Sequence, residues 1–189
     1  MAQEFLIALG SNLGSERGGP SDTLAAALQA MTDRGIALRR VSRFYATPCF
    51  PVGTGPDYVN ACAVVRDHEN ASDPRKFLQK LHEIERDFGR ERVQRWGSRT
   101  LDLDLVAMDD AVLPDARTWA DWRDLPPEDQ ISRAPDQLIL PHPRLQERAF
   151  VLVPLADVAA GWTHPILRQT VAQMRDSLPL PLRLEPVPL

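Results

Sequence analysis

The chain begins with a short apolar run and continues with an apolar pattern of helical period. Residues 5–9 form the apolar run, which ends at a Gly-Ser-Asn turn and therefore predicts a buried strand. Apolar residues at helical spacing follow between positions 24 and 31, and we expect Ser21 or Asp22 to cap that helix. The pattern therefore predicts a first strand followed by a first helix.

Two more strands and a second helix are expected next. Residues 36–45 are rich in β-branched and aromatic side chains and residues 58–65 alternate, so each segment is predicted to be a strand, with 47–57 as the joining loop. Ser72-Asp73-Pro74 is typical of a helix start, and Gly89 is a typical stop. The helix between them presents one stripe that we expect to be buried, made of Phe77, Leu81, Ile84 and Phe88.

The apolar pattern of the remaining sequence predicts one strand and two helices. Residues 100–107 have the pattern of a strand, whereas 150–157 and 167–178 carry helical apolar patterns, the second before a proline-rich tail. The order of elements favours an α/β (α+β) sandwich with a ferredoxin-like core, in which helices flank a mostly antiparallel sheet. We expect a single domain over residues 1–189.

Residues 109–137 interrupt this pattern. They are polar, acidic and punctuated by proline, so we interpret them as an insertion. A structureless loop of that length is uncommon in a compact domain. We therefore expect a short helix around 118–123, with Trp119 and Trp122 docked on the body of the protein.

Composition narrows the classes of function. The 189 residues are 43% apolar and 25% charged, as in an ordinary globular protein, and the net charge of −4 argues against a bulk basic surface for nucleic acid. Cys49 and Cys62 are too few for a disulfide framework or a zinc site, which fits a reducing cytoplasm. The N-terminal apolar run is too short for a signal peptide or a membrane span, so we expect the mature protein to begin at Met1.

Candidate chemistry is concentrated in residues 89–104. Asp102 and Asp104 alternate in a predicted strand, so their carboxylates share a face, with Cα atoms roughly 6–7 Å apart. That spacing suits Mg²⁺, which prefers oxygen ligands and shares them with substrate phosphates. An isolated Asp-x-Asp would more often be the water-facing side of an edge strand. Here the preceding arginines favour polyphosphate transfer, in which charge must be positioned and neutralised: Arg90, Arg92, Arg95 and Arg99.

The segment 95–104, Arg-Trp-Gly-Ser-Arg-Thr-Leu-Asp-Leu-Asp, resembles the signature of the 6-hydroxymethyl-7,8-dihydropterin pyrophosphokinase family. The resemblance covers nearly the whole chain apart from the insertion and the tail. Other pieces agree in the order that the family has: residues 8–12 (ALGSN), 44–48 (FYATP), 56–61 (PDYVNA), 84–85 (IE), 89–90 (GR), 140–143 (LPHP) and 148–151 (RAFV).

The resemblance implies an ATP- and Mg²⁺-dependent transfer of pyrophosphate to the hydroxymethyl group of the pterin, with AMP as the other product, in tetrahydrofolate biosynthesis. It implies that Asp102 and Asp104 hold two Mg²⁺ ions, while Arg90 and Arg99 neutralise the phosphates in transfer; these are the expected catalytic residues. The residues implied around the pterin are Thr47, Pro48, Phe50, Tyr58, Asn60, Trp96 and Phe150. Those implied around ATP are Glu85, Arg92, Arg95, Trp96, His142 and Arg148.

The chemistry of these side chains agrees with such roles. A flat pterin suits stacking on Phe150 and Tyr58, and the Asn60 amide offers donors and acceptors to its edge. Taken alone, an aromatic residue on an apolar face is more often plain core. His142 lies between prolines, where a hydrogen bond to a phosphate competes with a simple exposed loop histidine.

Two other classes of function use parts of the same pattern. A two-metal nuclease or nucleotidyltransferase would use the same aspartate pair, but net acidity and the lack of a basic stripe count against a nucleic-acid track. A non-catalytic α/β binding module would not need arginines beside two carboxylates. A P-loop kinase is excluded because no Walker A lysine motif occurs. We therefore expect small-molecule substrates, no nucleic-acid or membrane partner, and a cytoplasmic monomer.

Overall fold

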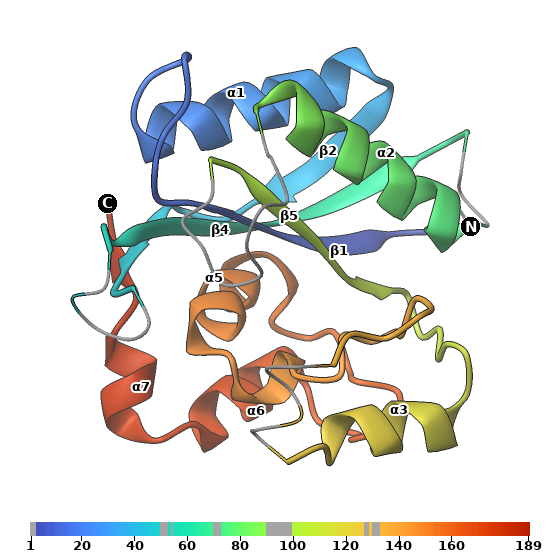
Figure 1. The fold of residues 1–189 in the computed structure, drawn as a ribbon. Helices are drawn as coiled ribbons and strands as arrows, with labels where there is room; N and C mark the ends of the chain where they lie inside the picture. Colours follow the sequence, from blue (N-terminus) through green and yellow to red (C-terminus); the bar gives the residue numbers. More distant parts are fainter. Residues whose placement is uncertain are drawn as a thin grey trace.

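The described residues of the computed structural model form a six-stranded sheet with helices on both faces (Figure 1). The description covers residues 3–49, 53, 55–69, 73–89, 100–126, 129 and 133–189. Strand order is β5-β1-β4-β3-β6, with β2 also paired to β4, and every pairing is antiparallel. The strands are β1 (Phe5–Ser11), β2 (Ile36–Val41), β3 (Tyr45–Thr47), β4 (Tyr58–Asp67), β5 (Asp102–Met108) and β6 (Val187–Pro188).

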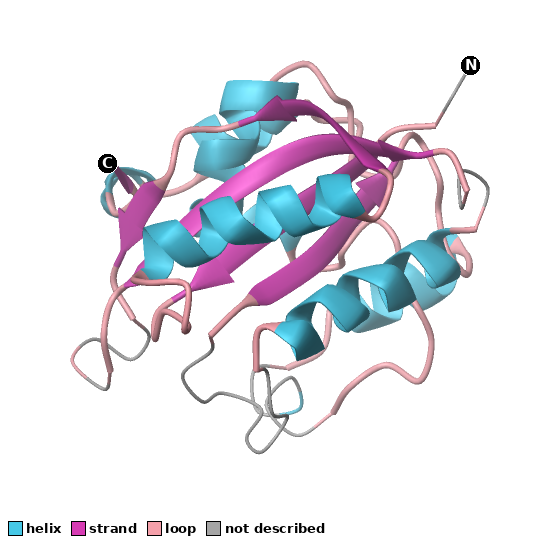
Figure 2. Cartoon of the chain, turned by 90° about the horizontal axis from the view of Figure 1, so that it is seen from above, coloured by secondary structure: helices cyan, strands magenta, loops and turns pink. Residues whose placement is uncertain are grey.

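The connections give the sheet a ferredoxin-like core. Helix α1 (Pro20–Asp33) follows β1, and helix α2 (Pro74–Asp87) connects β4 to β5. Both helices lie across the same face of the sheet, as Figure 2 shows. The predicted α+β sandwich with an antiparallel sheet and flanking helices is therefore confirmed.

One hydrophobic core lies between the sheet and helices α1 and α2. The predicted stripe of α2 is buried in it, and the ring of Phe77 stacks on Phe5 of β1 with centroids 4.1 Å apart. Asp73 caps α2 by accepting hydrogen bonds from the backbone N–H groups of Arg75 and Lys76, as the Ser-Asp-Pro start predicts. This face of the sheet is mostly apolar, and it also carries the buried Asp67 of β4, which accepts a hydrogen bond of 3.1 Å from Nζ of Lys80 on α2.

A second layer covers the opposite face. Helix α5 (Ala149–Ala159) lies on the sheet, and α6 (Val171–Ser177) packs against α5 (Figure 1). The layer also contains α3 (Ala116–Arg123), the 3₁₀ turn η1 (Leu145–Glu147) and α7 (Leu180–Leu184). Its core includes Leu6, Val64 and Val106 from the sheet. No helix in the described part of the chain is long and apolar enough to cross a membrane.

The structure differs from the predicted elements in several details, and Gly10 and Ser11, expected in a turn, belong to strand β1. The strand expected over 36–45 is two strands, because the backbone leaves β2 at Ser42, whose hydroxyl accepts a hydrogen bond from the N–H of Cys62. Helix α1 begins earlier than expected: Gly19 is its N-cap, and Asp22 accepts from the Gly19 N–H from inside the first turn. The helix expected over 167–178 begins only at position 171. The tail that follows contains α7 and β6, which pairs with β3.

The described part of segment 109–137, which we interpret as an insertion, folds as expected around Trp119. Helix α3 includes the predicted range 118–123 and begins two residues earlier, and the Trp119 side chain is 0% exposed. Trp122 does not dock in the same way, because it stays half-buried and its ring lies 5.6 Å from the guanidinium carbon of Arg133. The docking of the insertion therefore depends on one tryptophan rather than two.

Candidate active site

The candidate site is arranged around Gly10, near the end of the central strand β1. Gly10 is paired with Asn60 of β4 on one side and with Asp102 of β5 on the other. Two residues back, Ala8 is paired with Asp104 on the same edge. Because laterally paired residues project to the same face of a sheet, Asn60 and both aspartates lie on the face that α5 covers. The strand register thus brings the predicted metal ligands and a predicted pterin contact together.

Glycine is required at position 10 by this close approach. A Cβ atom added to Gly10 would lie 2.9 Å from Oδ1 of Asn60 and 4.0 Å from Cβ of Asp102. The Asn60 amide has little freedom to move away, because its Nδ2 donates a hydrogen bond of 2.5 Å to Oγ1 of Thr47. Thr47 is in turn paired with Tyr58. Three of the predicted pterin contacts therefore gather beside the aspartates.

Glu85 holds the strand that carries the aspartates. Its Oε1 accepts a hydrogen bond of 2.7 Å from the backbone N–H of Leu103, the residue between Asp102 and Asp104. Among the described residues β5 is the last strand in the sheet order, so the N–H groups on its outer side have no strand partner within that part of the chain. Glu85 is 1% exposed and reaches this N–H from α2. Its observed contact is with the strand, and its contact with ATP stays a prediction.

Arg148 and Phe150 reach the site from the start of α5. Arg148 is the N-cap residue of that helix, and its Nη1 lies 3.7 Å from Oδ2 of Asp104. Its guanidinium carbon lies 5.7 Å from the centroid of the Phe150 ring. Phe150 is 41% exposed, so part of its ring is accessible from solvent. The helix start thus presents a cation and an open aromatic ring next to the acidic pair.

His142 is held as a neutral hydrogen-bond donor. Its backbone N–H donates to the carbonyl of Val106, and its ring Nδ1 accepts from the backbone N–H of Arg144 at 3.1 Å. Burial, followed by the positive charges of Arg148 and Arg144, holds the pKa of His142 well below its ordinary value. Since Nδ1 is the acceptor, the proton of the neutral ring belongs on Nε2. His142 lines a small cavity with Asp104 and Arg148.

Comparison with known proteins identifies the family. The model of the 7,8-dihydro-6-hydroxymethylpterin-pyrophosphokinase (HPPK) family matches residues 6–160. The chain belongs to the HPPK family.

Two curated relatives that align with most of this chain are pyrophosphokinases of the same kind. The 2-amino-4-hydroxy-6-hydroxymethyldihydropteridine pyrophosphokinase of Synechocystis sp. is 35% identical over 170 residues, which cover 89% of this chain and 73% of the relative. The corresponding protein of Haemophilus influenzae is 34% identical over 174 residues, which cover 90% of this chain and 92% of the relative. The family match over residues 6–160 includes every described residue of the site above.

Solved structures of HPPK proteins share the fold. A crystal structure of Plasmodium falciparum HPPK-DHPS A437G with STZ-DHP matches 92% of this chain with a TM-score of 0.57 and 13% identity. A structure titled HPPK-DHPS in complex with substrates matches 93% with a TM-score of 0.61 and 12% identity. This chain spans 42% and 44% of those two chains, so it corresponds to less than half of each.

The structure describes ten of the sixteen predicted site residues. Asp102, Asp104, His142 and Arg148 lie together, Thr47, Tyr58 and Asn60 lie on the other side of Gly10, and Phe150 projects from α5. Pro48 is exposed directly after β3, and Glu85 is buried beneath β5. The other predicted residues lie outside the described part of the chain: Phe50, Arg90, Arg92, Arg95, Trp96 and Arg99.

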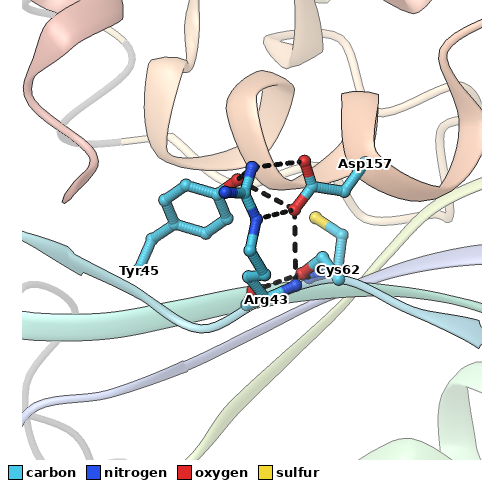
Figure 3. A network of polar contacts seen from close by, with 5 residues as sticks. Arg43, Tyr45, Cys62 and Asp157 are labelled. Carbon is cyan, nitrogen blue, oxygen red and sulfur yellow. Dashed lines mark hydrogen bonds and ion pairs between the residues drawn. The ribbon is translucent and has the colours of Figure 1, made fainter. Parts of the chain in front are cut away.

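A polar network fixes the far end of α5 to the sheet (Figure 3). The Arg43 guanidinium donates to both carboxylate oxygens of Asp157, at 3.1 and 3.0 Å, and the Tyr45 hydroxyl donates to the same carboxylate at 2.8 Å. Burial alone would raise the pKa of Asp157, but these hydrogen bonds lower it below its ordinary value. Burial and the nearby Asp157 raise the pKa of the Cys62 thiol, which therefore stays neutral. The network supports the helix that carries Arg148.

Sequence reasoning assigned no role to Gly10 or to this network. Gly10 belongs to the ALGSN motif, but its function depends on a register that spans three strands. Arg43 and Tyr45 meet Asp157 across more than 110 positions of sequence, a distance that leaves no local signal. Only the ALGSN motif at the end of the first strand pointed to this part of the site.

Proposed function

We propose that the polar end of the face covered by α5 binds Mg·ATP and the pterin side by side. As a member of the HPPK family, the chain transfers pyrophosphate from ATP to the hydroxymethyl group of 6-hydroxymethyl-7,8-dihydropterin, in folate biosynthesis. The observation that supports the location is the row Asn60, Gly10 and Asp102 across three adjacent strands. A pterin contact and a metal ligand there flank a position with no side chain.

The aspartate pair fits Mg²⁺ by the chemistry of its donors. Both carboxylates project from the same face of β5, and the side chain of Asp104 is 42% exposed. Among the described residues no group of three or more His, Cys, Asp or Glu side chains forms a closed metal site. Mg²⁺ does not need one, because it is commonly held by one or two carboxylates together with water and substrate phosphates. We therefore assign Asp102 and Asp104 as ligands of two Mg²⁺ ions.

Bound Mg²⁺ would neutralise phosphate charge and make the pterin hydroxyl a better nucleophile. The contribution of the protein is to bring the two substrates together. The hydroxyl oxygen forms a bond to the β-phosphorus, the bond from that phosphorus to the oxygen of AMP breaks, and the hydroxyl proton is released. Because little covalent chemistry falls to the protein, positioning and charge neutralisation account for most of the catalysis.

The pterin side of the site is formed by Thr47, Asn60, Tyr58 and Phe150, with Pro48 at the end of β3. The Asn60 amide is fixed by Thr47, so it presents a defined hydrogen-bonding edge. The exposed ring of Phe150 offers a face for stacking. Phe50 and Trp96 complete this pocket in our proposal.

The ATP side of the site is formed by Arg148 and His142, with Glu85 behind the strand. Arg148 supplies a permanent positive charge near Asp104, and His142 supplies an N–H donor that does not depend on protonation at neutral pH. Arg92, Arg95 and Trp96 complete the ATP contacts in our proposal. Arg90 and Arg99 neutralise the phosphates in transfer.

We also propose that the protein works as a cytoplasmic monomer, with residues 1–189 as a single domain and 109–137 as its insertion. Two buried free cysteines are consistent with a reducing compartment. The two-metal nuclease alternative loses support, because the family and the acidic net charge both favour a small-molecule substrate.

The test is the identity of the nucleotide product. ATP and Mg²⁺ are incubated with the protein, with and without 6-hydroxymethyl-7,8-dihydropterin, and AMP is separated from ADP by chromatography. We expect AMP to form only when the pterin is present. Formation of ADP would indicate transfer of a single phosphoryl group, and AMP formation without the pterin would indicate hydrolysis; either result would contradict the proposal.

A further inference from the structure

The segment that carries His142 is held at three successive backbone positions. Leu140 exchanges two backbone hydrogen bonds with Leu113, at 2.9 and 3.0 Å. The carbonyl of Pro141 accepts a hydrogen bond of 2.8 Å from Nε1 of Trp119, and the N–H of His142 donates at 2.8 Å to the carbonyl of Val106. Leu113 and Trp119 belong to the insertion, whereas Val106 belongs to β5. The insertion therefore holds the loop that leads into the site through hydrogen bonds to Leu140 and Pro141.

The bond from Trp119 acts on the peptide group that precedes His142. The Pro141 carbonyl and the His142 N–H belong to one planar peptide unit. Trp119 holds the oxygen of this unit and Val106 holds its hydrogen, so the orientation of the plane is fixed from both sides. That plane, together with the backbone torsion angle φ of His142, sets the direction in which the His142 side chain leaves the backbone. A buried carbonyl that lost its donor would rotate or admit water.

Trp119 is itself rigidly supported. Its side chain is 0% exposed, and its ring makes an edge contact with the His164 ring at 5.1 Å between centroids. The guanidinium carbon of Arg123 lies 5.3 Å from the centroid of the Trp119 ring. Asp115 caps helix α3 through two backbone N–H groups, so the helix that carries Trp119 has a fixed start. These contacts fix the position of the indole ring and therefore the direction of its N–H group.

We propose that Trp119 is a positioning residue for His142, through which the insertion sets the binding of the ATP phosphates. The inference rests on the proposed contact of His142 with ATP. Nε2 of His142 is oriented by two sets of contacts: the backbone hydrogen bonds at Pro141 and His142, and the hydrogen bond that Nδ1 accepts from the Arg144 N–H. Small displacements of a group that positions phosphates have large effects on the reaction.

The test combines Trp119→Phe with His142→Ala in a double-mutant cycle. Trp119→Phe keeps an aromatic ring but removes the N–H donor, and Trp122→Phe on the same helix is the matched control. We expect Trp119→Phe to raise the KM for ATP about tenfold with the KM for the pterin unchanged, and Trp122→Phe to change neither. In the His142→Ala background, Trp119→Phe should have no further effect on the KM for ATP.

The double-mutant cycle tests the ATP contact of His142 and the positioning role of Trp119 separately. If His142→Ala leaves the KM for ATP unchanged, the proposed ATP contact of His142 fails, and the positioning role fails with it. If His142→Ala raises that KM but Trp119→Phe does not, only the positioning role is contradicted. Equal effects of Trp119→Phe with and without His142 would also overturn it, because they would show a general packing effect.

A second substitution guards against a simple loss of folding. Site-specific replacement of Trp119 by 3-benzothienylalanine exchanges the indole N–H for sulfur and keeps the shape of the ring. We expect this variant to keep the melting temperature close to that of the wild type and to raise the KM for ATP as Trp119→Phe does. An unchanged KM for ATP in this variant would overturn the proposal.

Discussion

The two faces of the sheet use the same strands for different purposes. On β5, Leu103 and Leu105 enter the core beneath α1 and α2, whereas Asp102 and Asp104 project to the face of α5. Leu101, just before the strand, joins the first core. The period of two residues that defines a strand therefore separates a stabilising face from a chemical face, without any additional element.

The central strand shows the same division in the size of its side chains. Phe5, Ile7 and Leu9 fill the core under α1 and α2, but Ala8 and Gly10 on the other face are small. Because these residues are small, the side chains of the neighbouring strands β4 and β5 have room at the polar end of this face. The comparison shows that the site depends on two features of the sheet. One is the small size of Ala8 and Gly10, and the other is the charge of Asp102 and Asp104.

The largest expected effect contrasts two phenylalanines on opposite faces. Phe77→Ala removes a fully buried ring that stacks on Phe5, so we expect the free energy of unfolding to fall by about 3–5 kcal/mol. Turnover by the protein that remains folded should be unchanged. Chemical denaturation and steady-state kinetics measure the two quantities.

Phe150→Ala is the matched variant on the other face. Because Phe150 is partly exposed, we expect its loss to cost less than about 1 kcal/mol of stability, but to raise the KM for the pterin severalfold through lost stacking. The comparison between faces would break if Phe77→Ala impaired pterin binding selectively, or if Phe150→Ala destabilised the fold as much as Phe77→Ala.

The next effect concerns pH and the layer around α5. His164 is buried between Trp119 and Trp162, and burial lowers its pKa from 6.5 to about 4. Below pH 6.5 the unfolded chain takes up a proton that the folded chain does not. The contribution of His164 to the free energy of unfolding is therefore fully present above pH 6.5. It is lost as the pH drops towards 4, which lowers the free energy of unfolding by up to about 3 kcal/mol.

The measurement is the free energy of unfolding between pH 7 and pH 4 for the wild type and His164→Asn. The Asn amide oxygen can replace Nδ1, which accepts from the backbone N–H groups of Ile166 and Leu167. His142 contributes a slope of the same sign in both proteins, so the difference between them isolates His164. Equal slopes in the two proteins would rule out His164 as the cause.

A smaller effect is expected at Gly10. In Gly10→Ala the new methyl group would press on Oδ1 of Asn60, which is tied to Thr47. We expect the KM for the pterin to rise about tenfold, equivalent to about 1.4 kcal/mol. Ala8→Gly, which removes a methyl group from the same face, is the control and should leave that KM nearly unchanged. A Gly10→Ala protein with normal pterin affinity would show that Asn60 does not need this space.

Much of the fold was predictable because its signals are local. The α2 stripe and the alternation in β4 and β5 depend on residues a few positions apart, and all three elements formed as expected. The division of the strand expected over 36–45 was not predictable, because it depends on Ser42 meeting Cys62 in β4. β6 likewise needs β3 as a partner.

The site divides in the same way. The aspartate pair could be predicted because alternation in one strand fixes its geometry. The contact of Glu85 with Leu103 and the role of Gly10 could not, since each depends on how separate elements pack. The hydrogen bond from Trp119 to Pro141 could not be predicted either, because it joins residues 22 positions apart and depends on how α3 packs.

The most direct test of the account is the turnover of Asp102→Asn and Asp104→Asn, each of which removes a charge with little change in shape. Asp121→Asn, on the exposed surface of α3, is the control. We predict that pterin-dependent AMP formation falls by about 10³-fold or more in both site variants, with the melting temperature near that of the wild type and with normal turnover in the control. Turnover within a few-fold of the wild type in either folded site variant would contradict the assignment of the catalytic centre to this face of the sheet.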